Sequence, residues 1–137
     1  MRRILVLAAG VMLLAGCGNK ESELAQQMLQ SIESQYAKGE YRVVLDSIKK
    51  LREKFPEAIE QRKKALEIWQ EASLKITQAD IAVTDSALQT VARQMQAATD
   101  IATRNKLGVI RDSLQVRYEA LCGTVRVIHK RQEMLPR

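Results

Sequence analysis

Cysteine and histidine are the side chains best suited to nucleophilic, metal-binding or acid–base chemistry, and this chain of 137 residues has two cysteines and one histidine. Cys17 follows the small residues Ala15 and Gly16, whereas Cys122 and His129 lie far along the chain. A thiolate is a strong nucleophile, so Cys17 is the first candidate for covalent modification. A lone histidine with two distant cysteines does not make a usual zinc site, because structural zinc takes four such ligands.

The residues before Cys17 have the order of a secretory signal peptide. Arg2 and Arg3 form a basic start, and an apolar run covers residues 4–14. This run has about a dozen residues, fewer than the ~20 that a membrane-spanning helix needs. Small residues then precede the cysteine, as they do at a signal-peptide cleavage site. We therefore expect residues 1–16 to be a signal peptide and Cys17 to begin the mature chain.

The sequence Leu14-Ala15-Gly16-Cys17 resembles the lipobox of bacterial lipoprotein precursors. The resemblance implies that Cys17 receives a diacylglyceryl thioether and, after cleavage, an acyl chain such as palmitate on its amino group. Two or three acyl chains anchor a protein stably, since each buried CH2 contributes ~0.8 kcal/mol and one chain binds only marginally. The resemblance thus implies a lipoprotein held in the membrane of the cell envelope.

Residues 17–23 are expected to form the acylated cysteine and a short polar tether. Gly18 replaces the aspartate that tends to retain enterobacterial lipoproteins in the inner membrane, which favours the outer membrane. Glu21 and Glu23 near Lys20 resemble the signal that sends lipoproteins of Bacteroidota to the cell surface. A plain solvated linker explains these residues equally well, so the periplasmic face and the cell surface both stay open.

The composition beyond the tether is typical of helices. The whole chain has six glycines and two prolines, and aromatic residues make up 4% of it. Such a scarcity of turn-forming residues argues against a sandwich of short strands. Without Arg2 and Arg3 the net charge falls from +6 to +4, and we expect no nucleic-acid partner for an exported protein of this charge. We expect a single all-α domain over residues 24–137.

Two amphipathic helices are predicted first, over residues 24–37 and 41–54, with Gly39 in the turn between them and Pro56 after the second. Their apolar stripes are Leu24, Met28, Ile32 and Tyr36 on the first helix and Val44, Leu45, Ile48 and Leu51 on the second.

The segment Tyr36-Ala37-Lys38-Gly39-Glu40-Tyr41, with the later Phe55-Pro56, resembles one tetratricopeptide repeat. The resemblance implies a helical hairpin over residues 24–56 that docks on the next helix, because one such unit leaves its apolar face open. Ile32, Val44 and Leu51 are bulkier than the repeat prefers, and a plain helical hairpin is the alternative.

Residues 57–137 are predicted to form a long antiparallel helical hairpin of coiled-coil type, because apolar residues recur at intervals of seven. We expect the chain to reverse at Asn105–Gly108, and a break near Thr84 stays open. The recurring residues are Leu74, Ile81, Leu88, Met95 and Ala102; Thr77, Thr84, Val91 and Ala98; and Leu107, Leu114, Leu121, Ile128 and Leu135, widened by Ile110, Tyr118 and Val125. The alternative is a homodimer in which these seams pair between chains.

The remaining polar residues form no motif for catalysis. The carboxylates are scattered along the predicted helices, and the sequence has no phosphate-binding loop, serine elbow or metalloprotease motif. Cys122 lies on the apolar stripe of the last helix, where a small buried side chain is expected, and His129 lies at the edge of the seam. We therefore expect no enzyme, no metal and no cofactor.

These observations favour a non-enzymatic helical scaffold or adaptor that binds an envelope protein partner, a role common among tetratricopeptide-like lipoproteins. Tyr36, Tyr41 and Trp69 are the candidate partner-binding residues, and the same side chains suit a core. The alternative function is to bind an anionic envelope polymer, lipopolysaccharide or peptidoglycan, through the basic C-terminal helix. The candidate residues for that alternative are Arg126, Lys130 and Arg137.

Overall fold

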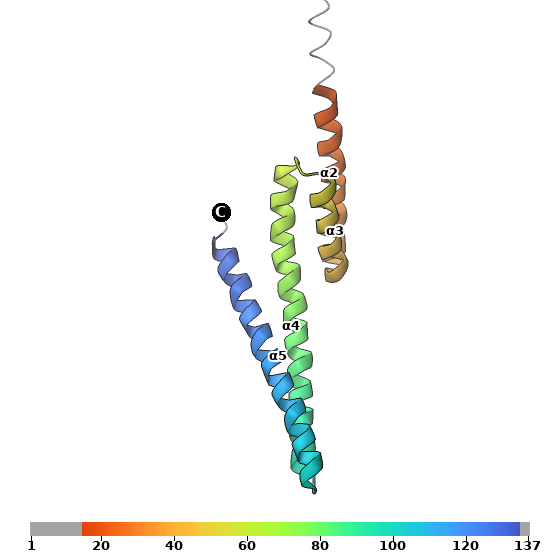
Figure 1. Cartoon of the computed structure of the whole chain (residues 1–137). Coiled ribbons are helices and arrows are strands. Elements are labelled where there is room, and N and C mark those ends of the chain that lie inside the picture. Colours follow the sequence, from red (N-terminus) through yellow and green to blue (C-terminus); the bar gives the residue numbers. More distant parts are fainter. Residues whose placement is uncertain (1–14, 135–137) are drawn as a thin grey trace, which may run out of the picture. The chain divides into compact units, whose positions relative to one another are not determined.

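A computed structural model describes residues 15–134 of the chain (Figure 1). This range contains four helices, and no strand occurs within it, which confirms the predicted all-α class. The helices are α2 (Ala15–Ala37), α3 (Tyr41–Lys54), α4 (Ile59–Ala97) and α5 (Ile101–Met134). The chain divides into two compact units after Ala72, so α4 contributes its beginning to the first unit and its remainder to the second.

The first unit is a hairpin of α2 and α3 that packs on the beginning of α4. Gly39 makes the turn with φ 78°, in the left-handed region that other residues rarely adopt. The amides of Gly39 and Glu40 donate to the carbonyls of Tyr36 and Gln35 at 2.9 and 3.0 Å. These two bonds make a Schellman motif, which ends α2 and reverses the chain. The predicted hairpin is therefore confirmed.

The core of the first unit joins large side chains on the hairpin to small ones on α4. Full burial of one leucine or isoleucine side chain contributes ~1.5–3 kcal/mol, so a few such residues hold the unit together. The alanines on α4 present little bulk, which lets the hairpin lie close to that helix. The core residues are Leu29 and Ile32 on α2, Val44, Ile48 and Leu51 on α3, and Ala65 and Ala72 on α4.

The predicted apolar stripe of α3 is confirmed, but that of α2 is partly wrong. Leu24 is 45% exposed, whereas Leu29, outside the predicted stripe, is fully buried together with Ala25 and Ile32. A strict i+4 series drifts by ~40° at each step because the helix has 3.6 residues per turn. Leu24 is therefore carried away from the face that contains Ile32.

α2 also begins earlier than predicted. Residues 17–23, expected to be a tether, are helical, because α2 already starts at Ala15. Lys20, Glu21 and Glu23 are good helix formers, and no proline interrupts the segment. The residues of the signal peptide before Ala15 lie outside the described residues, so the cleavage itself stays a prediction.

The turn between α3 and α4 contains Pro56. The amide of Phe55 donates to the carbonyl of Leu51 at 3.0 Å, and the guanidinium of Arg62 donates to the carbonyl of Pro56. α4 begins after this turn, at Ile59. The sequence analysis places the boundary between the first and second hairpins at residues 56 and 57, which lie in this turn. The two compact units instead divide after Ala72, within α4.

The second unit is an antiparallel hairpin made by α4 beyond Ala72 and by α5 (Figure 1). α4 passes through Thr84 without a break. Thr77 and Thr84 are buried, and their hydroxyl groups donate to the carbonyls of Ser73 and Asp80 at 2.8 and 2.7 Å. A bond to the preceding turn satisfies a threonine hydroxyl without interrupting the helix.

The reversal lies between Ala97 and Ile101. Asp100 caps α5, because its Oδ1 accepts a hydrogen bond from the amide of Thr103 at 2.7 Å. This bond also lowers the pKa of Asp100. The guanidinium of Arg104 donates to the carbonyl of Ala98 at 2.8 Å, which satisfies a carbonyl at the end of α4.

The predicted reversal at Asn105–Gly108 is wrong, since these residues lie inside α5. Glycine in the interior of a helix costs only about 1 kcal/mol relative to alanine, so Gly108 does not have to end one. The cap at Asp100 begins α5 before Gly108 is reached. α5 is consequently longer, and α4 shorter, than the sequence indicated.

Within residues 15–134 the predicted seam between α4 and α5 is confirmed by burial, with two exceptions, and Leu135 lies outside the described residues. Ile110 is 48% exposed and Ala102 is also exposed. The buried seam residues are Thr77, Thr84, Val91 and Ile128. The half-buried ones are Leu74, Ile81, Leu88, Met95, Ala98, Leu107, Leu114, Tyr118, Leu121 and Val125. A single pair of helices thus leaves one side of most seam residues open to solvent.

Replacing Thr84 with valine is expected to raise the free energy of unfolding of the second unit by about 0.5–1 kcal/mol. The buried hydroxyl bonds only to a carbonyl of its own helix, so its removal leaves no donor unpaired and adds a methyl group to the seam. Urea unfolding of the full chain measures the change. Thr90→Val is the matched control, because Thr90 makes the same bond to Ser86 but is exposed. An equal change in the free energy of unfolding for Thr84→Val and Thr90→Val would show that burial of Thr84 is not the cause.

Candidate functional site

The predicted anchor lies at the beginning of the first unit. Cys17 is in the first turn of α2, together with Ala15 and Gly16, and Leu14 of the lipobox resemblance lies outside the described residues. α2 therefore connects the residue expected to carry lipid directly to the buried core at Ala25 and Leu29.

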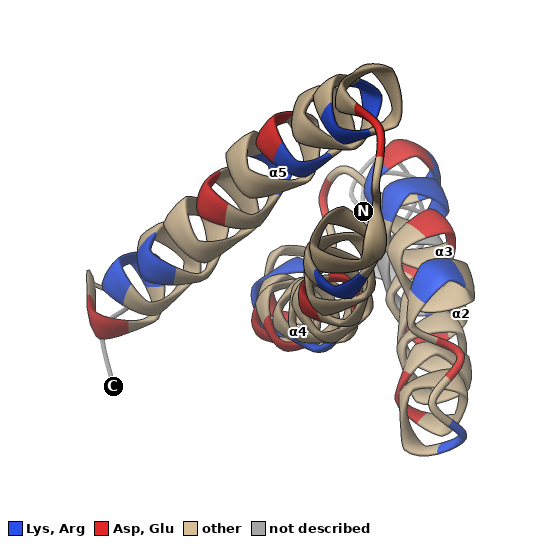
Figure 2. Ribbon diagram, turned by 90° about the horizontal axis from the view of Figure 1, so that it is seen from below, with Lys and Arg blue, Asp and Glu red and all other residues tan. Residues whose placement is uncertain are grey.

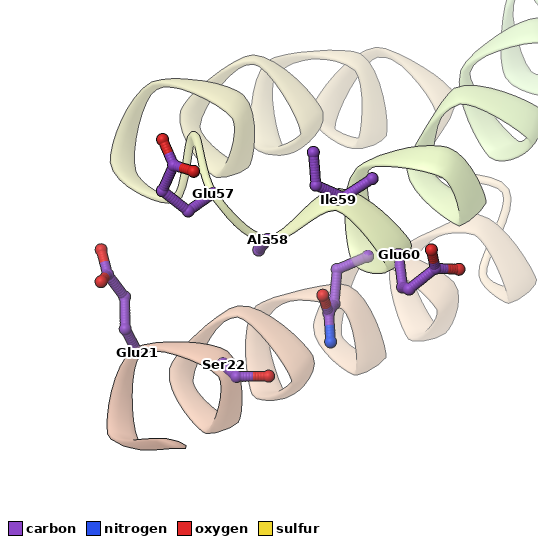
Figure 3. Close-up of a pocket in the computed structure, with 7 residues that line it drawn as sticks. Glu21, Ser22, Glu57, Ala58, Ile59 and Glu60 are labelled. Atoms are coloured by element: carbon purple, nitrogen blue, oxygen red, sulfur yellow. The ribbon is translucent and has the colours of Figure 1, made fainter. Parts of the chain in front are cut away.

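A hollow of about 410 Å³ lies between α2 and the turn that precedes α4 (Figure 3). Glu21 and Ser22 on α2 face Glu57 and Ala58 across it (Figure 3). Glu60, also at its edge, is paired with Lys63 at 3.1 Å. Within residues 15–134 no group of three or more histidine, cysteine or acidic side chains is placed to hold a metal ion.

The three aromatic residues predicted to bind a partner pack against the core of the first unit. The rings of Tyr36 and Tyr41 meet edge to face, with 5.4 Å between their centroids. The ammonium group of Lys49 lies 6.0 Å from the ring centroid of Trp69. Burial raises the pKa of Tyr36, and a hydrogen bond to the carboxylate of Glu71 adds to the effect. The structure thus brings these residues to the core and leaves them only half exposed.

The outer face of α3 is a surface that the sequence analysis missed. Val43 is 48% exposed there, and the exposed residues Lys50 and Lys54 follow it on the same side of the helix. Figure 2 shows basic residues recurring along α3. The exposed charged residues of α3 are Arg42, Lys49, Lys50, Arg52 and Lys54, against Asp46 and Glu53. The cluster of basic residues at positions 49–54 indicates this surface in the sequence, although the net basic excess of the chain lies in its C-terminal helix.

Two of the three basic residues proposed for polymer binding lie on α5. Arg126 and Lys130 are exposed one turn apart, and Arg137 lies outside the described residues. Cys122 is a half-buried free thiol rather than a fully buried one. It lies beside Tyr118, whose pKa is raised chiefly by the nearby thiol of Cys122. His129 is exposed.

Comparisons of the chain with protein-family models, with curated proteins and with solved structures found no match. None of the helices within residues 15–134 combines the length and the apolar character needed to cross a membrane.

Proposed function

We propose that this chain is a lipoprotein of the bacterial cell envelope, anchored in the outer membrane by acylated Cys17, and that it is a non-enzymatic helical scaffold for a protein partner. The observation that carries the proposal is the order of features at the amino terminus. Basic residues, an apolar run, two small residues and Cys17 follow one another. α2 includes Cys17, so the helical body begins at the anchor.

The first unit supports the scaffold role because it holds one helix rigidly with its outer face free. Val44, Ile48 and Leu51 fix the inner face of α3 in the core. The outer face presents Val43 among lysines and arginines. An exposed apolar side chain within a basic surround fits an acidic partner segment, since complementary charge speeds encounter and apolar burial slows release. The resemblance to a tetratricopeptide repeat adds support by analogy.

Val43→Glu combined with Lys50→Glu is expected to lower recovery of the partner at least about tenfold, which corresponds to ~1.4 kcal/mol of binding free energy. Both positions are exposed, so the fold is expected to change by less than about 0.5 kcal/mol. The measurement is quantitative co-purification of the tagged full-length chain from bacterial membranes after chemical cross-linking.

The matched control is Val83→Glu with Lys75→Glu, because this exposed apolar and basic pair lies on α4. Variants of Tyr41 and Trp69 are tested as a third set. Their partner recovery is compared only where circular dichroism shows that the variant keeps its fold. Unchanged recovery with the folded α3 variant, together with loss in the aromatic set, would move the partner site to the aromatic residues. Unchanged recovery in all sets would remove the first unit as the binding site.

A further inference from the structure

The outer face of α5 carries a second apolar stripe, opposite the seam with α4. Val109, Val116, Val127 and Met134 are 71%, 67%, 51% and 74% exposed. With ~100° per residue, these side chains fall within about 20° of one line along the helix, and the seam leucines lie ~120–160° away from it. We call this surface the outer stripe. It consists of Val109, Val116, Ala120, Gly123, Val127 and Met134.

The spacing of the outer stripe is the same in both directions along the chain. Successive members are separated by 7, 4, 3, 4 and 7 residues, so the midpoint lies between Leu121 and Cys122. An interface with a twofold axis has to be self-complementary, because residue i of one copy meets residue j of the other and j meets i. A second α5 laid antiparallel across this midpoint matches the members in pairs. The pairs are Val109 with Met134, Val116 with Val127, and Ala120 with Gly123.

Gly123 has no reason within its own chain to be a glycine. A Cβ atom added there would meet no other atom within 4 Å, and glycine inside a helix costs about 1 kcal/mol relative to alanine. In the antiparallel pair it would lie opposite Ala120 of the second copy. Two small residues at the centre let helix axes approach to the near end of the usual 8–10 Å range. The larger side chains then pack on both sides of this close contact.

The charges beside the outer stripe agree with this pairing near its centre. Glu119 and Arg126 lie on the same flank of the stripe. In the antiparallel pair, Glu119 of each copy lies beside Arg126 of the other copy, which gives two ion pairs. Asp112 would face Glu133 of the second copy near each end. That like-charge contact is exposed and therefore weak, and Arg111 already pairs with Asp112 at 2.7 Å.

We propose that two copies of this chain associate through the outer stripe of α5, with the two helices antiparallel. The stripe extends over ~37 Å of helix. A contact of this length and ~10 Å width covers about 400 Å² per copy, roughly half of a standard interface. The dimer is therefore expected to be reversible. This inference does not depend on the lipid anchor or on the partner surface of α3.

Disulfide cross-linking of the full-length chain, purified in detergent with Cys122 replaced by alanine, tests the pairing. Val116→Cys and Val127→Cys are prepared as separate single variants. Mixing them and oxidising is expected to give at least about five times more covalent dimer than either variant alone. Val83→Cys, on α4 and 69% exposed, replaces Val116→Cys in the control mixture and is expected to give only the background of the parent.

Gly123→Leu is expected to remove the cross-link, because the added side chain blocks the close contact, while its Cβ atom meets no other atom of its own chain within 4 Å. Its retained helix content, measured by circular dichroism, separates this effect from unfolding. Self-linking of Val116→Cys alone would indicate parallel helices and overturn the proposal. A yield of covalent dimer no higher than background in every mixture would overturn the proposal as well.

Discussion

Replacing Cys17 with alanine is expected to abolish incorporation of a palmitate analogue into the protein and to leave the signal peptide uncleaved. The thioether forms only on a thiol, and cleavage before residue 17 follows lipid transfer in the lipoproteins that the lipobox resembles. Each buried CH2 of an acyl chain contributes ~0.8 kcal/mol, so loss of all chains removes the whole anchoring energy. Metabolic labelling followed by mass spectrometry of the purified chain measures both effects.

Cys122→Ala is the control for the labelling experiment, because Cys122 is a free thiol on α5, far from the lipobox-like segment in the sequence. This variant is expected to be labelled and cleaved like the parent. An unmodified amino terminus upstream of Cys17 in the native protein would contradict the anchor. That result would leave the antiparallel pairing of α5 untouched, since the pairing is measured independently.

The best-predicted element is α3, whose observed bounds, Tyr41–Lys54, are those expected from the sequence. Gly39 and Pro56 mark both ends with strong local preferences, and a 14-residue helix is too short for its apolar pattern to drift far. Longer helices gave larger errors. On α2 the predicted inner face wrongly includes Leu24 and omits Leu29, and the predicted start of α5 at Gly108 is wrong because the cap at Asp100 begins this helix.

Surfaces were harder to predict than helices because a pattern of apolar residues does not say which stripe is covered. α5 has two such stripes, and only burial separates the seam at Leu114 from the exposed positions Val109 and Val116. The aromatic residues posed the same difficulty. Tyr36, Tyr41 and Trp69 suit a core and a binding groove equally well by residue type, and the structure shows them half-buried and packed against the core cluster.

Leu51→Ala is expected to lower the free energy of unfolding of the first unit by about 2–5 kcal/mol. Leu51 is fully buried on α3, within the core shared by α2, α3 and the beginning of α4. The change removes buried apolar surface and leaves a cavity, because the backbones of three helices do not collapse fully around a missing side chain. A domain of this size has only ~5–15 kcal/mol of stability in total, so much of the first unit's stability depends on this residue.

Hydrogen exchange of the full chain measures this effect separately in each unit. Amides of α2 and α3 are expected to exchange faster in Leu51→Ala, whereas amides near the cap of α5 at Asp100 keep their rates, because the units have separate cores. Leu66→Ala is the matched control, since Leu66 is the same residue type in the same unit but is 41% exposed. Equal acceleration in both variants would mean that burial in this core does not hold α3 in place. The rigid outer face proposed to bind a partner would then lose its physical basis.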